Sequence, residues 1–273
     1  MVHTVEMTPA SVTTPAAKST GIDLRGGVAV ITGAGSGIGK AAALRVAASG
    51  AAVGLGDIAL GKVEEVAEEI RSSGGSAVAC RLDVTDPASC EQLVAVVKQE
   101  FGRLDFAFNN AGIVDTNPAL TADTSVDAWN RLISTNLTGV FQCMRAQLPA
   151  MTQAGGSIVN TSSIMGTRGT AGGAAYCASK HGVIGLTRAA ALEYGRYGIR
   201  INVVCPGYVA TPMTVGEASV FSDKHIDAAI KRSALKRLGE PIEIADVVAW
   251  LFSANSSYVT GAHFDVDGGL SAA

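Results

Sequence analysis

The chain has 273 residues, of which 48% are hydrophobic and 16% are charged, and its formal net charge is −3. This length suits one large α/β domain or two small ones, and the absence of any basic block argues against nucleic acid or an anionic membrane surface as a partner. No run of about 18 uninterrupted apolar residues occurs, so no transmembrane helix is expected.

The first 21 residues differ in composition from the rest of the chain. Residues 1–21 are rich in Thr, Pro, Ala and Ser and have little apolar periodicity. They lack the apolar core of a signal peptide and the Arg-rich character of a transit peptide. We expect a flexible extension at residues 1–21. Since no linker or repeat divides the remainder of the chain, we expect a single domain at residues 22–273.

A short apolar run is followed by a glycine-rich turn and a helix-forming stretch. Residues 27–32 are typical of a strand buried on both faces, residues 33–39 form the turn, and residues 40–47 favour a helix. This layout brings backbone N–H groups and the positive end of a helix to a pyrophosphate. The alternative is a turn that only permits tight packing, and the position between strand and helix favours nucleotide binding. The motif reads Thr32-Gly33-(x)₃-Gly37-x-Gly39.

The second predicted strand, at residues 51–57, ends in an acid. A carboxylate at Asp57 can accept hydrogen bonds from both hydroxyls of an adenosine ribose and would repel a 2′-phosphate. No Lys or Arg follows before Lys62. The sequence therefore favours NAD as the cofactor and disfavours NADP. The alternative is an ordinary solvated acid in a loop.

Further strands alternate with helices along the rest of the chain. Strands are expected at residues 77–82, 104–108, 157–161, 199–204 and 263–267, and helices at residues 62–73, 87–101, 126–151, 175–194 and 241–251. This alternation predicts a parallel, doubly wound sheet, in which ligands lie beyond the carboxyl ends of the strands. Asp83, the run Asn109-Asn110-Ala111-Gly112 and Ser163 all follow such strand ends.

A Tyr–Lys pair lies on the predicted helix at residues 175–194. Tyr176 and Lys180 are four residues apart, so both project from one helix face. An ammonium close to a phenol favours the phenolate and lowers the phenol pKa toward neutral pH. Ser163 ends the preceding strand and has a hydroxyl that can hold a substrate oxygen. The alternative is an amphipathic helix with a chance Tyr and Lys.

In their order and spacing, these motifs resemble the short-chain dehydrogenase/reductase family, over about Leu24 to Gly269. The resemblance implies a Rossmann-like, doubly wound, seven-stranded parallel sheet with helices on both faces. It implies an enzyme that transfers a hydride between nicotinamide and a secondary alcohol or ketone. It also implies a homotetramer, paired through the helices near residues 126–151 and 176–194.

The resemblance assigns roles to individual residues. Tyr176 would be the general acid and base, Lys180 would lower its pKa and bind the nicotinamide ribose, and Ser163 would orient the substrate oxygen. Asn136, in a kinked part of its helix, would anchor a water that links Lys180 to solvent. The residues expected at the cofactor are Gly33, Ser36, Gly37, Ile38, Gly39, Asp57, Asp83, Val84, Asn110, Ala111, Gly112, Tyr176, Lys180, Pro206, Gly207, Val209 and Thr211.

The substrate side is expected to be apolar. Residues 212–237 mix polar and apolar types and predict one or two short helices that form a mobile lid. Together with the loops before it, this lid suits an alicyclic, terpenoid or steroid-like alcohol, and a sugar remains an alternative. The residues expected at the substrate are Ser163, Met165, Tyr176, Tyr208 and Met213.

Two other functions compete with this interpretation. A 3-oxoacyl-acyl-carrier-protein reductase would need a basic surface on which the acidic carrier protein docks. The candidate residues for such a surface are Lys231, Arg232, Lys236 and Arg237. Asp57 and the acidic balance count against it, and a solvated helix face explains the basic residues. A catalytically inactive nucleotide-sensing module would be marked by loss of the Tyr or the Lys, and both are present.

The cysteines and histidines give no sign of a disulfide frame or a metal site. The five cysteines are scattered, odd in number and without a C-x-x-C pair, as is typical of a reduced, cytoplasmic protein. The four histidines form no H-x-x-x-H pair and have no clustered carboxylates beside them, so no metal is expected.

Overall fold

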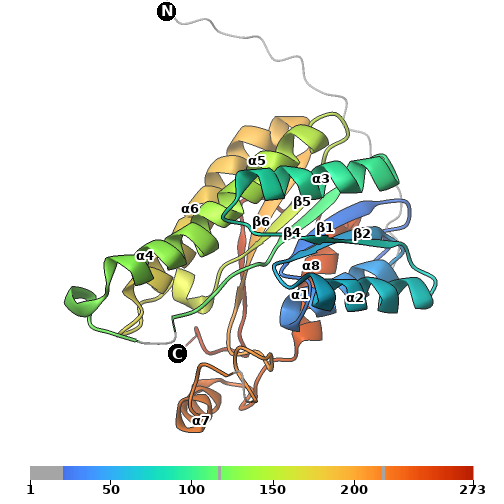
Figure 1. Ribbon diagram of the computed structural model, residues 1–273. Coiled ribbons are helices and arrows are strands. Elements are labelled where there is room, and N and C mark those ends of the chain that lie inside the picture. The colour runs from blue at the N-terminus through green and yellow to red at the C-terminus, as the bar shows by residue number, and fades with distance from the viewer. Residues whose placement is uncertain (1–20, 116–117, 217–218, 273) are drawn as a thin grey trace, which may run out of the picture.

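A seven-stranded parallel sheet forms the centre of the computed structural model, which describes residues 21–115, 118–216 and 219–272 (Figure 1). The strand order is β3-β2-β1-β4-β5-β6-β7. This confirms the predicted Rossmann-like, doubly wound sheet. The strands are β1 (Val28–Thr32), β2 (Ala52–Asp57), β3 (Ala77–Arg81), β4 (Phe106–Asn109), β5 (Gly156–Thr161), β6 (Ile199–Pro206) and β7 (His263–Val266).

Helices cover both faces of the sheet and leave one helix apart, beyond the two layers (Figure 1). The helices α1, α2 and α8 share one hydrophobic cluster with the sheet, and α3, α5 and α6 share the other. The outlying helix is α7. The helices are α1 (Gly37–Ala48), α2 (Leu60–Ser72), α3 (Pro87–Phe101), α4 (Val126–Ile133), α5 (Gly139–Met151), α6 (Ala174–Tyr194), α7 (Asp223–Arg232) and α8 (Pro241–Phe252).

The apolar strands divide their side chains between the two clusters. In β1, Ala29 and Ile31 join the cluster with α1, α2 and α8, whereas Val28 and Val30 join the cluster with α3, α5 and α6. Successive side chains of a strand point to opposite faces of the sheet. A run without polar alternation is therefore what a strand covered on both sides requires.

The register brings three strand ends into one row. Thr32, the last residue of β1, pairs with Asn109 of β4, and Asn109 pairs with Asn160 of β5. The chain winds outward in opposite directions from β1 and β4, so the connections on either side leave a crevice beyond these ends. This crevice positions the candidate site.

A buried polar network ties β4 and β5 to the helices behind them. The amides of Asn109 and Gln147 hydrogen-bond each other in both directions, at 3.1 and 2.8 Å. Asn109 Nδ2 also donates to Asn160 Oδ1 at 2.9 Å, and Asn160 Nδ2 donates to Thr187 Oγ1 at 2.9 Å. All four side chains are at most 1% exposed. Because a buried polar group is costly without a partner, the network fixes the relative positions of β4, β5, α5 and α6.

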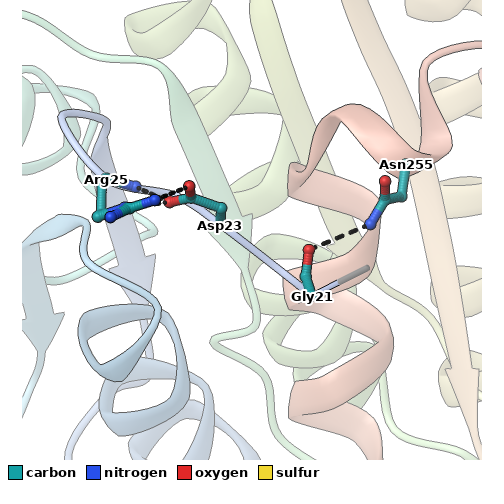
Figure 2. Close-up of polar contacts among 4 residues, drawn as sticks. All are labelled: Gly21, Asp23, Arg25 and Asn255. Atoms are coloured by element: carbon teal, nitrogen blue, oxygen red, sulfur yellow. Dashed lines mark hydrogen bonds and ion pairs between the residues drawn. The ribbon is translucent and has the colours of Figure 1, made fainter. Parts of the chain in front are cut away.

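The described chain begins with a short docked segment. Figure 2 shows Asn255 donating to the carbonyl of Gly21, at 3.4 Å, and Arg25 paired with Asp23. This attaches the start of the described chain to the segment after α8. Of the predicted flexible extension, residues 1–20 lie outside the described residues.

One predicted helix is interrupted, and the predicted lid contains a single helix among its described residues. The helix expected at residues 126–151 is α4 and α5 joined by a π-helical segment at Ser134–Thr138. Such a segment arises where a local interaction interrupts the i to i−4 bonding, and here Asn136 turns its amide to the backbone of Ile113. Within the predicted lid, the structure has the one helix α7 among the residues it describes. No helix of the described part of the chain is long and apolar enough to cross a membrane.

Gly54 in β2 tests how tightly the sheet packs against α3. A Cβ there would lie 2.0 Å from Cγ2 of Val97, which is fully buried. We expect Gly54→Ala to lower the free energy of unfolding by about 1–3 kcal/mol through overpacking. The control is Gly61→Ala in α2, where a Cβ meets nothing within 4 Å. That change should raise stability by up to about 1 kcal/mol. Urea unfolding measures both, and equal effects would contradict the tight contact.

Candidate active site

The glycine-rich turn between β1 and α1 requires glycine for two separate reasons. Gly33 and Gly37 have φ values of +65° and +53°, in a backbone region that residues with a Cβ rarely adopt. A Cβ on Gly39 would lie 1.9 Å from the carbonyl oxygen of Gly33. Gly39 therefore lets the first turn of α1 pack against the end of β1. The N-terminus of α1 is left open toward the crevice.

The Thr32 hydroxyl links this turn to the loop after β4. It accepts hydrogen bonds from the backbone N–H groups of Asn110 and Ala111, each at 3.0 Å. The Asn110 amide in turn donates to the carbonyls of Thr32 and Gly33, at 3.3 and 3.4 Å. The two loops that border the crevice thus form one hydrogen-bonded unit.

Asp57 is held against the glycine-rich turn at the end of β2. Its Oδ2 accepts from the backbone N–H of Gly35 and its Oδ1 from that of Ala59, both at 3.0 Å. An ionised carboxylate has about four acceptor positions. Two therefore remain for further donors, such as a pair of ribose hydroxyls. The carboxylate also lines the hollow next to the turn.

Asp83 and Val84 follow β3 and border a second hollow beside the first. Asp83 Oδ1 accepts from the backbone N–H and the hydroxyl of Thr85, and these bonds lower the pKa of Asp83. This second hollow is also lined by Gly33, Asp57 and Gly112. Both predicted residues therefore face the space that continues from Asp57.

Tyr176 and Lys180 lie one turn apart in α6 and face the end of β5. The Lys180 ammonium is 5.7 Å from the centre of the Tyr176 ring and donates to the carbonyl of Thr161 at 3.0 Å. Ser163 follows β5, and its hydroxyl lies close enough to Tyr176 to oppose the effect of burial on the pKa of that phenol. The Ser163 hydroxyl also accepts from the backbone N–H of Met165 at 3.2 Å, which orients it. The predicted Ser, Tyr and Lys are thus brought together.

Burial shifts the pKa values of both members of the pair. It raises the pKa of Tyr176 to about 12, against a smaller opposite effect of the Ser163 hydrogen bond. It lowers the pKa of Lys180 to about 8. The pKa of Tyr176 is therefore raised where a lowering by Lys180 was expected, because loss of hydration is the largest effect on this phenol. A phenolate at this position needs additional positive charge in the crevice.

Asn136 lies behind the Tyr–Lys pair. Its side chain donates to the carbonyl and accepts from the N–H of Ile113, both at 2.8 Å. These two hydrogen bonds attach the Asn136 side chain to the loop after β4. A Cβ built on Gly112 would lie 3.1 Å from Asn136 Oδ1 and 3.5 Å from Lys180 Nζ. Asn136 and Lys180 thus flank the same glycine. The predicted water relay stays a prediction.

Two adjoining hollows gather the residues predicted for the cofactor. Gly39 is the exception, since it packs between the turn and α1 and lines neither hollow. The larger of the two is lined by Gly33, Ser36, Gly37, Ile38, Asp57, Asn110, Ala111, Gly112, Tyr176, Lys180, Pro206, Gly207, Val209 and Thr211, among others. In the described part of the chain, no group of three His, Cys, Asp or Glu side chains is arranged to hold a metal ion.

A further hollow of about 180 Å³ opens on the other side of Ser163 and Tyr176. Its lining includes every residue predicted for the substrate. Ser163, Tyr176 and Met213 line this hollow and the cofactor hollow alike. A molecule bound in each would therefore meet its neighbour at the Ser163 and Tyr176 hydroxyls.

Sequence reasoning missed three contributors to the site. Ser162, the residue before Ser163, donates its hydroxyl to the Lys180 carbonyl at 2.8 Å and so fixes α6 to β5. Thr161 supplies the carbonyl that binds the Lys180 ammonium. His225 of α7 reaches the substrate hollow. The first two lie beside Ser163 at the tip of a predicted strand, whereas His225 had no sequence signal beyond its place in the predicted lid.

Known proteins are similar to this chain over most of its length. A family model described as enoyl-(acyl carrier protein) reductase matches residues 33–271. Cyclohexanol dehydrogenase of Acinetobacter sp. strain SE19 is 45% identical over 242 residues, which are 88% of this chain and 93% of that protein. A 3-oxoacyl-acyl-carrier-protein reductase of Thermotoga maritima is 42% identical over 248 residues, 90% of this chain and 98% of that protein. The crystal structure of levodione reductase has a TM-score of 0.85 at 38% identity and covers 92% of this chain and 99% of its own.

The buried Lys180 predicts a dependence of stability on pH. Its pKa is lowered from 10.5 to about 8, so the unfolded chain binds more protons between these values and stability rises with pH there. Relative to Lys180→Met, the wild type should gain roughly 2 kcal/mol of unfolding free energy between pH 7 and pH 10. Lys98→Met, at an exposed position of α3, should leave the pH dependence unchanged. Urea unfolding across this range measures the effect, and a constant difference would contradict a lowered pKa.

Proposed function

The chain belongs to the short-chain dehydrogenase/reductase family, and we propose that it is an NAD-dependent oxidoreductase acting on a secondary alcohol or ketone of a single alicyclic ring. The observation that carries this proposal is the meeting of two hollows at Ser163 and Tyr176. One hollow has the glycine turn and carboxylate that suit a dinucleotide. The other has the size and lining that suit an apolar ring.

The size of the substrate hollow favours a single ring over a terpenoid or steroid. An apolar protein cavity of about 150 Å³ holds one benzene molecule. The hollow here measures about 180 Å³, which suits one six-membered ring with its oxygen. Ile164, Met213 and Phe221 in its wall would face the hydroxyls of a sugar without hydrogen bonds, which counts against the sugar alternative.

The residues at the junction can move the proton of the reaction. Oxidation of an alcohol removes a hydride, which bound nicotinamide accepts, and a proton, for which the protein must supply a base. Tyr176 is suited to take this proton, and Ser163 to hydrogen-bond the oxygen as negative charge develops on it. Positive charge in the crevice, from Lys180 and from an oxidised cofactor, favours the Tyr176 phenolate and opposes the effect of burial on its pKa.

Lys180 is suited to a second task. Its ammonium has three protons, of which one is used on the Thr161 carbonyl. The other two are free to bind ribose hydroxyls in the hollow that Lys180 lines. Asn136, across Gly112 from this ammonium, is placed to take part in proton exchange with solvent.

The alternative of an acyl-carrier-protein reductase has the similarity to the Thermotoga maritima enzyme in its favour. The basic residues considered for docking a carrier are partly occupied within the chain. Arg237 forms a two-point ion pair with Glu243, and Lys236 donates to the carbonyl of Lys231. Lys231 and Arg232 lie in the last turn of α7, where positive charge stabilises the helix. These contacts favour a small-molecule substrate over a carrier-bound one.

The proposal extends to assembly and location. A homotetramer is supported by large apolar side chains left exposed on α4 and α5, since Val126, Trp129 and Phe141 are between 41% and 72% exposed. A cytoplasmic location is supported by five cysteines that are all free thiols. We propose a single catalytic domain from residue 22, with residues 212–237 as its lid.

Replacement of Tyr176 tests the proposed chemistry. Tyr176→Phe removes the proposed base and should lower kcat for ring-alcohol oxidation by roughly 10²- to 10⁴-fold. Because the ring is kept, NADH binding measured by fluorescence titration should be largely retained. Tyr194→Phe, at the far end of α6, is the matched control and should retain activity. Retention of most activity by Tyr176→Phe would refute the assignment.

Replacement of Asp57 tests the choice of cofactor. NADH should bind the wild type at least about tenfold more tightly than NADPH, because the carboxylate would repel a 2′-phosphate. Asp57→Ala should lower the ratio of the NADPH dissociation constant to the NADH dissociation constant. Asp246→Ala, which removes only a surface ion pair with Arg45, should leave it unchanged. Equal or tighter NADPH binding by the wild type would mean that Asp57 does not face the ribose.

A further inference from the structure

A hydrogen-bonded pair of side chains lies in the wall of the substrate hollow. The Tyr208 hydroxyl is 2.7 Å from Nε2 of His225. Tyr208 is in the loop after β6, and His225 is in the first turn of α7. Both line the hollow together with Ser163 and Tyr176. The pair therefore joins the proposed lid to the core at the place where a substrate would bind.

Aromatic packing fixes the position of this pair. The Phe221 ring stacks on His225 with 5.0 Å between centroids and meets Tyr208 edge-on at 5.5 Å. The backbone of Tyr208 is held as well, because its carbonyl accepts from the N–H of Gly239 at 2.9 Å. Ser222 caps α7 and accepts from the N–H of His225 at 3.3 Å. A polar group held this firmly is preorganised for recognition.

The pair keeps unused hydrogen-bonding capacity. A tyrosine hydroxyl has one donor and two acceptor positions, and the bond to His225 uses one of the three. If Tyr208 donates to the imidazole, its oxygen can accept from a ligand hydroxyl. If the imidazole donates, the Tyr208 proton is free for a ligand carbonyl. The pair can therefore match an alcohol or a ketone.

Two other polar side chains of this wall have partners of their own within the protein. Asp115 lies 3.9 Å from the guanidinium of Arg131, and the Thr214 hydroxyl is 3.3 Å from that of Thr211. Tyr208 and Tyr176 both line the hollow of about 180 Å³, so a ring-sized molecule in it borders both phenols.

We propose that the Tyr208–His225 pair is a second recognition point, which binds an oxygen on the substrate ring remote from the reacting carbon. The preferred substrates are then ring diols, hydroxy ketones and diketones, ahead of ring alcohols with a single oxygen. This inference rests on the proposed function and narrows its substrate class. Without a second oxygen in the substrate, the two hydrogen-bonding positions that Tyr208 does not use on His225 would face an apolar ring.

The test compares cyclohexane-1,4-diol with cyclohexanol as substrates. The measured quantity is the ratio of their kcat/KM values with NAD, for the wild type, Tyr208→Phe, His225→Phe and the double variant. The wild-type ratio should favour the diol, and Tyr208→Phe should lower the ratio about tenfold through loss of one hydrogen bond. His225→Phe keeps a ring to stack on Phe221 and should lower the ratio less. The two changes should be non-additive in the double variant, because both act through one bond.

Tyr197→Phe, at a tyrosine outside the hollow, is the control and should leave the ratio unchanged. NADH titration confirms that each variant retains its cofactor site. Equal losses on both substrates in Tyr208→Phe and His225→Phe would mean that the pair only supports the fold, and would overturn this inference alone. A wild type that does not favour the diol would also overturn it. A wild type that oxidises neither alcohol would overturn the proposed function, and this inference with it.

Discussion

The candidate site depends on how a buried ammonium is satisfied. Lys180 is 4% exposed, and its Nζ donates to the Thr161 carbonyl at the end of β5. An unpaired charge at such a depth would be strongly destabilising, so this bond fixes the position of α6 relative to the end of β5. Ser162 makes a second bond between the same two elements, to the Lys180 carbonyl. Because Ser163 continues from β5 and Tyr176 lies one turn before Lys180, these contacts place the two hydroxyls opposite each other.

The two sides of this junction differ in chemical character. On the dinucleotide side, backbone groups and carboxylates dominate, and the glycine turn is bonded through Thr32 to the loop after β4. On the substrate side, side chains from irregular segments form the wall, and three rings, Tyr208, Phe221 and His225, connect those segments. The first side is built from strand ends and is fixed by the sheet. The second is built from a loop and a ten-residue helix, so it can vary without disturbing the sheet.

Sequence reasoning succeeded where a local pattern has one structural solution. The uninterrupted apolar run before Thr32 predicts a strand covered on both faces, and the four-residue spacing of Tyr176 and Lys180 predicts a shared helix face. It did not succeed where the outcome depends on contacts between distant segments. The kink around Asn136 was expected only from the family resemblance, because the interruption at Ser134–Thr138 accompanies bonds to Ile113, more than twenty residues away. The raised pKa of Tyr176 depends on burial, which spacing does not reveal.

The amide network behind the strand ends has a consequence for how this chain can vary. Asn109, Gln147, Asn160 and Thr187 satisfy one another in series, and each is buried. Replacement of one member leaves the donor or acceptor of its neighbour unmatched, so the effects of substitutions at the four positions depend on one another. The four residues therefore form an epistatic unit, and viable changes within it come as concerted sets.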